Sequence, residues 1–467
     1  MSTEIRLERD SMGAMEVPAD ALYGASTQRA VLNFPVSGRP APVALIHAYG
    51  RIKGAAARAN HDLGLLNAEV ADLIAEAAAE VAAGRLDDHF VVDTFQTGSG
   101  TSTNMNANEV ISNRCCQLAG NPIGAKDPVH PNDHVNLGQS SNDTFPTAIH
   151  LAAGLQLRDQ LKPALAALQQ ALAAKRDAFD TVLKIGRTHL MDATPVRLGQ
   201  EFGGFARQTE LAVARLDRAI EALLELPLGG TAVGTGLNCH PDFPTKAIAI
   251  LAAETGLPWR EAADHFEAQA AKDAVVEVSG QLKTVATSLF KIANDIRLLG
   301  SGPRCGIGEL RLPATQPGSS IMPGKVNPVM AESVMQVCAR VFGNDATITW
   351  CAANGNLELN VMMPAMAGAL LESISLLTNV SHVFREKCIE GIEANVERCE
   401  ELIEYSLAMV TSLNARIGYD RAAAIAKESV TTGRTVRELC LDQLDDLGLT
   451  EDELNAALDP ASMTRPG

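Results

Sequence analysis

The feature that most constrains the fold is a long apolar seam in the middle of the chain. Apolar side chains recur there at alternating steps of three and four residues, at Val275, Val278, Leu282, Val285, Leu289, Ile292, Ile296 and Leu299. Proline is absent from this stretch until Pro303. Such a period predicts one long helix that packs nearly parallel to partner helices.

Other segments have the same helical period. One apolar stripe runs from Val70 to Val81, and further long helices are expected at about 151–179, kinked at Pro163, and at about 202–226. Aromatic residues are only 4% of the chain, which disfavours a β-sandwich. We therefore predict a mainly α fold with a central long-helix bundle. A two-stranded coiled coil is the alternative, but several long helices in one chain favour the bundle.

Polar segments rich in Gly and Pro separate the expected helices at 96–108, 126–146, 186–199, 228–244 and 300–328. Loops of this length inside a helical protein are more often functional than idle. We predict two smaller domains that flank the bundle: an N-terminal domain at 1–140 and a C-terminal helical domain at 396–467. The central helical-bundle domain then covers 141–395.

Charge and cysteine content narrow the possible functions. The 39 Lys+Arg against 56 Asp+Glu give a net charge of −17, which argues against a nucleic-acid partner. The nine cysteines are scattered without a C-x-x-C pair, so we expect reduced thiols in the cytoplasm. The apolar stretch 361–371 is too short to span a bilayer and residues 1–15 have no apolar leader pattern, so no membrane partner is expected.

The segment from Gly318 to Pro328 has the composition of a mobile anion-binding loop. Asn327 and Pro328 are typical of an N-cap and a first helical residue, opening a helix to about Phe342. Lys325 then lies just ahead of a helix N-terminus, where free N–H groups favour a carboxylate or a phosphate. On composition alone, an ordinary Gly/Pro surface loop remains an equal alternative.

The same segment, 318–328, resembles the signature of the fumarase/aspartase superfamily. Six further blocks resemble the class II fumarate hydratases within it, in the same order along nearly the whole chain: 96–101, 104–106, 129–133, 139–143, 186–190 and 229–236. A single block would be modest evidence, whereas an ordered series is specific. The resemblance implies reversible hydration of fumarate to (S)-malate in the tricarboxylic acid cycle.

This resemblance also implies the roles of individual residues. Ser319 would be the base that removes a proton next to a carboxylate, and His189, with Glu332, would exchange a proton with the leaving water. Substrate binding would fall to Ser99, Gly100, Thr101, Asn104, Ser140, Ser141, Asn142, Thr188, Ser320, Lys325, Val326 and Asn327. Such hydroxyl and amide donors suit the carboxylates of a dianion bound by an acidic chain.

A second carboxylate site is implied at Asp127, His130, Pro131, Asn132 and Asp133. The family often has a basic residue where this chain has Asp127, beside Lys126, and this difference weakens the expectation of anion binding there. A Pro-Asn-Asp turn is the alternative interpretation of this block.

Neither a metal nor another cofactor is expected. The ten histidines form no H-x-x-H or H-E-x-x-H pattern, and neither glycine-rich segment has the spacing of a phosphate-binding or dinucleotide-binding loop.

Three other functions fit the sequence less well. Aspartate ammonia-lyase shares the segment 319–327, but Ser99 and the blocks at 140–142 and 130–133 favour the hydratase. Argininosuccinate lyase fits less well because its local blocks differ. A non-catalytic structural role is disfavoured because Ser319, His189 and Lys325 are all present. The resemblance further implies a homotetramer whose active sites are shared between chains.

Overall fold

The computed structural model describes residues 4–466, and most of them are helical. The strands of this part of the chain are short and lie in pairs: β1 (Ile5–Asp10) with β2 (Gly13–Pro18), β3 (Leu183–Thr188) with β4 (Met191–Arg197), β5 (Glu225–Leu226) with β6 (Arg260–Glu261), β7 (Leu310–Arg311) with β10 (Glu393–Ala394), and β8 (Gly355–Asn356) with β9 (Leu359–Asn360). Only β5 and β6 pair in parallel. The prediction of a mainly α fold is confirmed.

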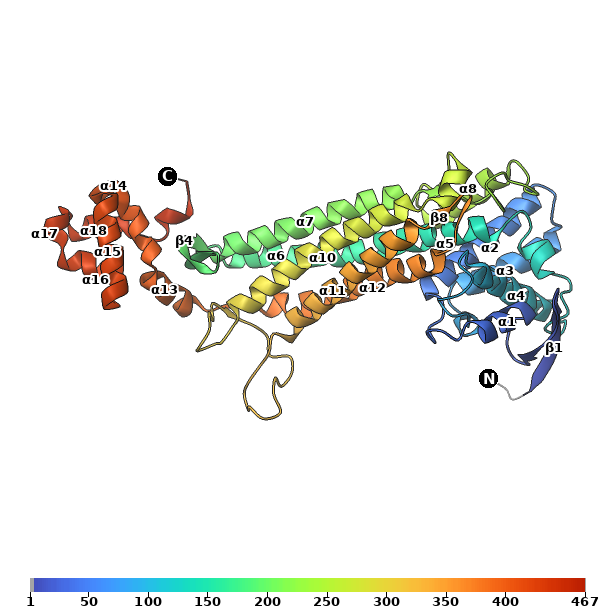
Figure 1. The fold of residues 1–467 in the computed structure, drawn as a ribbon, viewed down its shortest axis with the longest axis horizontal. Helices are drawn as coiled ribbons and strands as arrows, with labels where there is room; N and C mark the ends of the chain where they lie inside the picture. The colour runs from blue at the N-terminus through green and yellow to red at the C-terminus, as the bar shows by residue number, and fades with distance from the viewer. Residues whose placement is uncertain (1–3, 467) are drawn as a thin grey trace. The chain divides into compact units, whose positions relative to one another are not determined.

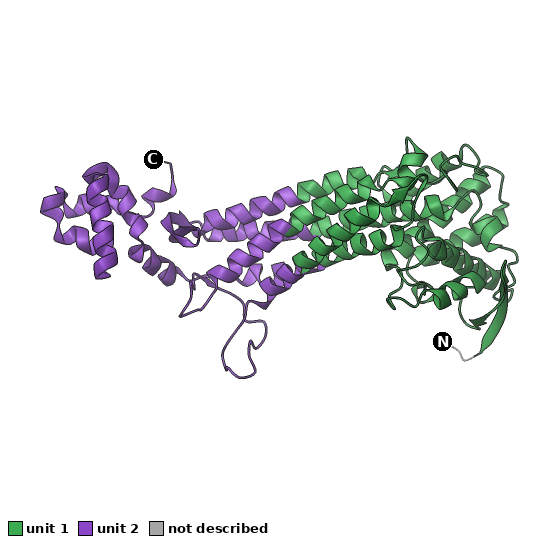
Figure 2. Ribbon diagram, in the orientation of Figure 1, with its two compact units in different colours: residues 1–163, 213–286, 337–378 green, residues 164–212, 287–336, 379–467 purple. Residues whose placement is uncertain are grey.

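Contacts group the chain into two compact units (Figures 1 and 2). Unit 1 contains residues 1–163, 213–286 and 337–378, and unit 2 contains residues 164–212, 287–336 and 379–467. Helices wholly within unit 1 are α1 (Ala25–Asn33), α2 (Val43–Asp62), α3 (Ala68–Ala82), α4 (Thr101–Leu118), α5 (Ser141–Gln156), α8 (Phe243–Thr255) and α9 (His265–Ala270). The three contiguous domains expected from the sequence stay a prediction.

The apolar seam lies on helix α10 (Asp273–Leu299), as predicted, and all eight seam residues are buried. Polar contacts join α10 to two neighbouring helices. In unit 1, Ser279 donates to Asp345 of α11 (Val329–Ala352) over 2.8 Å. In unit 2, the Lys291 ammonium lies 4.7 Å above the Phe205 ring of α7 (Leu198–Ala222). Packing between long helices of one chain supports the bundle rather than the coiled coil.

The helix expected at 151–179 begins ten residues earlier, at Ser141. Ser140 and Asp143 form a capping box there, so the polar end of the predicted 126–146 loop is the first turn of α5. A π-helical turn at 157–161 then leads into α6 (Lys162–Ala178). This irregular turn directly precedes Pro163, which has no N–H to donate to a preceding carbonyl.

Two further helices have boundaries that differ from the prediction. Helix α11 starts at Val329 rather than Pro328 and continues through Gly343 to Ala352, beyond the expected end at Phe342. Asn344 donates to Glu372 and Ser373 of α12 (Met363–Lys387), so packing outweighs the roughly 1 kcal/mol helix penalty of a glycine. Similarly, α7 ends at Ala222, four residues early, because β5 takes up residues 225–226.

Helix α12 is longer than the apolar stretch 361–371 indicated. By length and composition, the segment Met363–Gly391 could cross a bilayer, since its most apolar 18-residue window has a mean hydropathy of 1.2. However, 67% of its most apolar window is buried inside the protein, as is typical of a core helix in a bundle. The expectation of no membrane partner stays a prediction.

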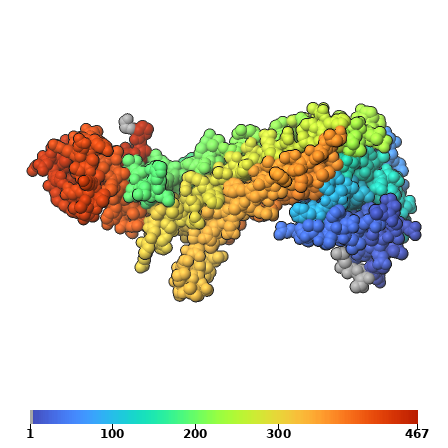
Figure 3. Space-filling view, viewed as in Figure 1, coloured from blue at the N-terminus to red at the C-terminus, as the bar shows by residue number. Residues whose placement is uncertain are grey.

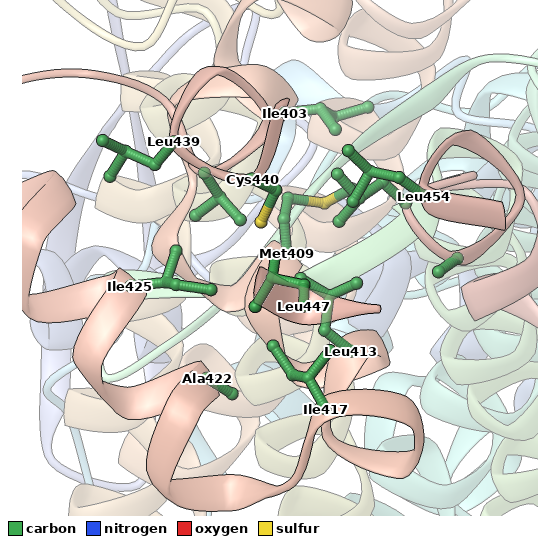
Figure 4. Close-up of a cluster of buried hydrophobic side chains, with 13 residues drawn as sticks. Ile403, Met409, Leu413, Ile417, Ala422, Ile425, Leu439, Cys440, Leu447 and Leu454 are labelled. Atoms are coloured by element: carbon green, nitrogen blue, oxygen red, sulfur yellow. The ribbon is translucent and has the colours of Figure 1, made fainter. Parts of the chain in front are cut away.

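The C-terminal part of unit 2 packs around a separate apolar cluster, shown in Figure 4. Its helices are α13 (Val396–Tyr405), α14 (Asn414–Ile417), α15 (Tyr419–Thr432), α16 (Val436–Asp442), α17 (Leu444–Leu447) and α18 (Glu451–Ala457). Within the cluster, Leu413, Cys440 and Leu454 are fully buried. Short helices can therefore stay folded here because each buries one apolar face against the others.

Truncation of the seam tests its contribution to stability. Ile292→Ala should lower the free energy of unfolding by about 2–4 kcal/mol, because it removes a fully buried side chain and leaves a cavity. Urea unfolding at a fixed protein concentration measures this. The half-buried Ser288 of the same helix provides the control, and Ser288→Ala should change stability by less than about 0.5 kcal/mol. Equal effects of the two changes would contradict the importance of the seam.

Candidate active site

In unit 1, two predicted substrate-binding blocks meet in a cluster of hydroxyl groups. The Ser99 and Thr101 hydroxyl oxygens are 2.8 Å apart, and those of Thr101 and Ser141 are 2.7 Å apart. We call Ser99, Thr101 and Ser141 the hydroxyl cluster. The fold thus joins side chains that lie 40 residues apart in the sequence.

Two glycines allow the backbone to make this turn. A Cβ at Gly98 would lie 1.7 Å from the Val361 carbonyl oxygen, and one at Gly100 would lie 1.9 Å from the Phe145 ring. Gly100 also has a φ of 73°, the left-handed region that glycine tolerates. The Gly-Ser-Gly sequence is therefore required by close packing against neighbouring elements.

The hydroxyl cluster lies at the N-termini of α4 and α5, two helices of 18 and 16 residues. Gly100 caps α4 without a side-chain hydrogen bond, whereas Ser140 caps α5. The unpaired N–H groups and dipoles at helix starts favour negative charge. These two helix starts give a positive local potential in a chain whose net charge is −17.

Asp143 is a buried carboxylate that sequence reasoning assigned no role. It accepts hydrogen bonds from the backbone N–H groups of Ser140, Gly229 and Thr231, over 2.9–3.0 Å. Burial raises its pKa, and the three N–H donors oppose this shift. The carboxylate thus fixes the 229–236 block to the start of α5. The capping pattern Ser-Ser-Asn-Asp at 140–143 was the sequence signal that could have identified Asp143 as a structural residue.

Asn142 makes a second link to this block by donating to the Ala232 carbonyl over 2.7 Å. Its amide is therefore already engaged within the chain. Ser140 and Asn142 flank Ser141, so three predicted residues are placed together at the start of α5.

The predicted second carboxylate site forms a helix cap in the structure. The His130 Nδ1 atom accepts from the backbone N–H groups of Asn132 and Asp133, over 3.3 and 3.2 Å, at the start of the π-helical turn 131–135. The Asp133 carboxylate lies 3.2 Å from the same Nδ1, and a hydrogen bond between them requires a hydrogen on Nδ1, which then cannot also accept from the two N–H groups. Lys126 donates to the Arg9 carbonyl, and Asp127 accepts from Asn121. Anion binding by this block stays a prediction.

In unit 2, His189 lies at the tip of the hairpin formed by β3 and β4. His189 and Leu190 have φ values of 56° and 62°, which match the two central residues of a type I′ turn. Non-glycine residues rarely occupy this region, and strain of this kind is concentrated at functional sites. Thr188, His189 and Leu190 are all exposed.

A buried network of charges anchors this hairpin. Arg187 donates to both carboxylate oxygens of Glu309, over 3.0 and 2.9 Å, and the Lys184 ammonium lies 3.2 Å from the same carboxylate. Glu309 is fully buried, and Lys184 also donates to Glu201, whose pKa is raised by burial. Sequence reasoning missed Glu309, because no local pattern pairs it with a residue 122 positions away.

The segment between α10 and α11, coloured yellow to orange, projects from the helices of unit 2 (Figures 1 and 3). Its tip is closed by two hydrogen bonds: Gly318 N–H donates to the Lys325 carbonyl, and the Asn327 amide donates to the Gly318 carbonyl, each over 2.8 Å. We call residues 318–327 the closed loop.

Ser319 forms a local hydrogen-bonded turn within the closed loop. Its Oγ accepts hydrogen bonds from the backbone N–H groups of Ile321 and Met322, over 3.2 and 3.1 Å. N–H donors directed at an oxygen stabilise its negative form. Ser320, Lys325 and Val326 are exposed, and Asn327 is half-buried.

The three predicted catalytic residues all belong to unit 2. Glu332 lies in the first turn of α11, half-buried. Among residues 4–466, neither a hydrogen bond nor an ion pair connects Ser319, His189 and Glu332. Their catalytic roles stay predictions. In the same part of the chain, no group of three or more His, Cys, Asp or Glu side chains could hold a metal ion.

Comparisons with known proteins agree with this architecture. A family model described as "Lyase" matches residues 13–343, and one described as "Fumarase C C-terminus" matches residues 409–465. These matches define the chain as a lyase.

Relatives named class II fumarate hydratase are similar over the whole length. One from Mycobacterium tuberculosis is 54% identical, and the match covers 99% of this chain and 97% of the relative. Another from Methylorubrum extorquens is 50% identical, and the match covers 100% of this chain and 98% of the relative. A crystal structure of class II fumarase from Schistosoma mansoni is 39% identical, with a TM-score of 0.95 and 99% and 100% covered. The chain belongs to the class II fumarate hydratase family.

Loss of the buried charge at Glu309 should destabilise the protein. Glu309→Gln leaves Arg187 and Lys184 without their carboxylate and should lower the free energy of unfolding by about 3–5 kcal/mol, measured by urea unfolding. The exposed pair Arg207–Glu210 offers a matched control, because Glu210→Gln should cost less than about 1 kcal/mol. A loss at Glu309 no larger than that at Glu210 would contradict the anchoring role.

Proposed function

We propose that this protein catalyses the reversible hydration of fumarate to (S)-malate. Whole-length relatives bearing the name fumarate hydratase support the reaction. The observation that carries the proposal is the pair of backbone N–H groups directed at Ser319 Oγ in the closed loop. We assign the reaction to the tricarboxylic acid cycle and the protein to the cytoplasm, in keeping with its nine free cysteines.

In the malate-to-fumarate direction, the difficult step is removal of a proton from the carbon next to a carboxylate. The electron pair left behind becomes a second negative charge on that carboxylate, and preorganised donors must stabilise it. Ser319 acts as an alkoxide base in our proposal. A free serine hydroxyl is too weakly acidic for this, and the two N–H donors stabilise the anion, with Lys325 of the same closed loop as the proposed source of positive charge.

The hydroxyl of malate must leave as water, which requires a proton. We assign this proton to His189, because imidazole exchanges protons near neutral pH. Glu332 is the proposed partner of that imidazole. The turn that strains His189 supports the assignment, since it holds the side chain exposed at the hairpin tip.

Binding of the dianion is assigned to the hydroxyl cluster and to the loops of unit 2. Ser99, Gly100, Thr101, Asn104, Ser140, Ser141 and Asn142 would hold the substrate together with Thr188, Ser320, Lys325, Val326 and Asn327. We further propose a homotetramer in which each active site combines loops from three chains. The exposure of His189 and of the closed loop supports this arrangement.

A direct assay tests the reaction. The purified protein should consume fumarate without ammonium, measured as loss of its ultraviolet absorbance, and malate should accumulate. Omission of the enzyme provides the blank. Consumption that requires ammonium would instead indicate aspartate ammonia-lyase activity and would refute the proposal.

Two variants test the proposed base and the proposed proton donor. Ser319→Ala and His189→Asn should each lower kcat by about 100-fold or more, because each removes a group that transfers a proton. Sedimentation should show the same assembly as the unchanged protein. Ser288→Ala and His382→Asn are matched controls outside the proposed site, and both should keep normal turnover. Near-normal rates in the two site variants would exclude this chemistry.

A further inference from the structure

Lys53 is a fully buried lysine of α2 that has no role in the reaction proposed above. Its amine donates to two side-chain oxygens, Asn136 Oδ1 over 3.0 Å and Gln139 Oε1 over 2.9 Å. Both acceptors are amides, whose oxygen and nitrogen ends can exchange places by rotation. An amine donor between them selects the orientation in which both oxygens face inward.

The first of these amides leads to the start of α4. Asn136 Oδ1 also accepts from the Asn104 amide over 3.1 Å, so one oxygen is shared by Lys53 and Asn104. The other end of the Asn104 amide accepts from the Thr144 hydroxyl over 3.3 Å. Asn104 is a predicted substrate-binding residue in the first turn of α4, and its orientation is thus set through Asn136.

The second amide leads to the start of α5. Gln139 directly precedes Ser140, the N-cap of α5. With its oxygen held by Lys53, the Gln139 amide nitrogen donates to the carbonyls of Val135 and Leu137, over 3.1 and 3.2 Å. The backbone carbonyl of Gln139 also accepts from the side-chain amide of Asn136, over 3.2 Å. The turn 135–139, which directly precedes Ser140, is therefore held together by hydrogen bonds that include the Lys53 amine.

The protonation of Lys53 agrees with this geometry. Burial lowers its pKa to about 7, while the charge of Asp143 opposes the shift. A neutral amine has two N–H donors, and the oxygens of Asn136 and Gln139 supply two acceptors. Both hydrogen bonds are therefore satisfied in the neutral form, so orientation of the amides does not depend on the charge.

We propose that Lys53 is a positioning residue of the substrate site, which orients Asn104 through Asn136 and the Ser140 corner through Gln139. This inference rests on the proposed function. Lys53 itself contacts neither the hydroxyl cluster nor any reacting atom in the scheme above. Because the residues that it positions bind substrate rather than transfer protons, its loss should affect KM more than kcat.

Lys53→Met retains most of the side-chain volume and removes the donors. We expect the KM for fumarate to rise about tenfold with kcat changed less than about threefold, the size of effect given by loss of one well-oriented contact to substrate. Asn136→Leu breaks the same connection at a half-buried position and should raise KM similarly. Circular dichroism and sedimentation show whether Lys53→Met folds and assembles. If it does not, Asn136→Leu alone tests the positioning role.

Lys272 offers a matched control within unit 1. It is also buried, with a pKa lowered by burial to about 7, but its amine donates to the backbone carbonyls of Ala268, Gln269 and Ala271. Lys272→Met should change KM by less than about twofold, because this amine does not contact the amides of Asn136 and Gln139. It thus reports any general effect of losing a buried amine. An equal rise in KM for both lysine variants would overturn the positioning role.

A second readout separates this inference from the proposed function. Calorimetric binding of succinate, an unreactive four-carbon dicarboxylate, should weaken about tenfold in Lys53→Met and Asn136→Leu. If the unchanged protein binds succinate but does not hydrate fumarate, the proposed function fails and the variants still test the positioning role. Unchanged succinate affinity and KM in a folded variant would overturn the inference, as would absence of succinate binding by the unchanged protein.

Discussion

The burial of apolar faces on the long helices determines where every polar group of the candidate site can lie. Helix α10 buries all eight residues of its seam, and this leaves chemistry to helix ends and to the loops between helices. The hydroxyl cluster lies at two helix starts, and the closed loop directly precedes a third, that of α11. Helix N-termini supply positive potential without side-chain charge, which suits dianion binding by an acidic protein.

Buried ionisable side chains perform a second task, that of holding the loops. Asp143, Glu309 and Lys53 are all buried, and each meets several donors or acceptors from segments distant in sequence. Replacing a whole buried ion pair by apolar side chains is often neutral for stability, although removing one partner alone is costly, so the value of such groups lies in the arrangement that they enforce. Glu309 anchors the hairpin that carries the exposed His189. Asp143 holds the start of α5, and the amides that Lys53 contacts lead to Asn104 and Ser140.

The sequence was most informative where the pattern is local and periodic. The seam of α10 and the stripe of α3 were predicted because apolar spacing alone specifies a buried helical face. The start of α5 was missed because polar capping residues looked like loop, and the end of α11 because Gly343 looked like a stop. The resemblance identified the blocks of the candidate site, but the partners of Asp143, Lys53 and Glu309 depend on tertiary contacts that no local spacing reveals.

The two halves of the candidate site are each organised within their own unit. The hydroxyl cluster and its amide network need only residues of unit 1, and the His189 hairpin with the closed loop needs only residues of unit 2. If loops from several chains combine as proposed, each chain brings groups that are already oriented, and association need not order them. Preorganised donors stabilise a transition-state charge without reorganising during the reaction, so internal anchoring of every loop is what a shared site requires.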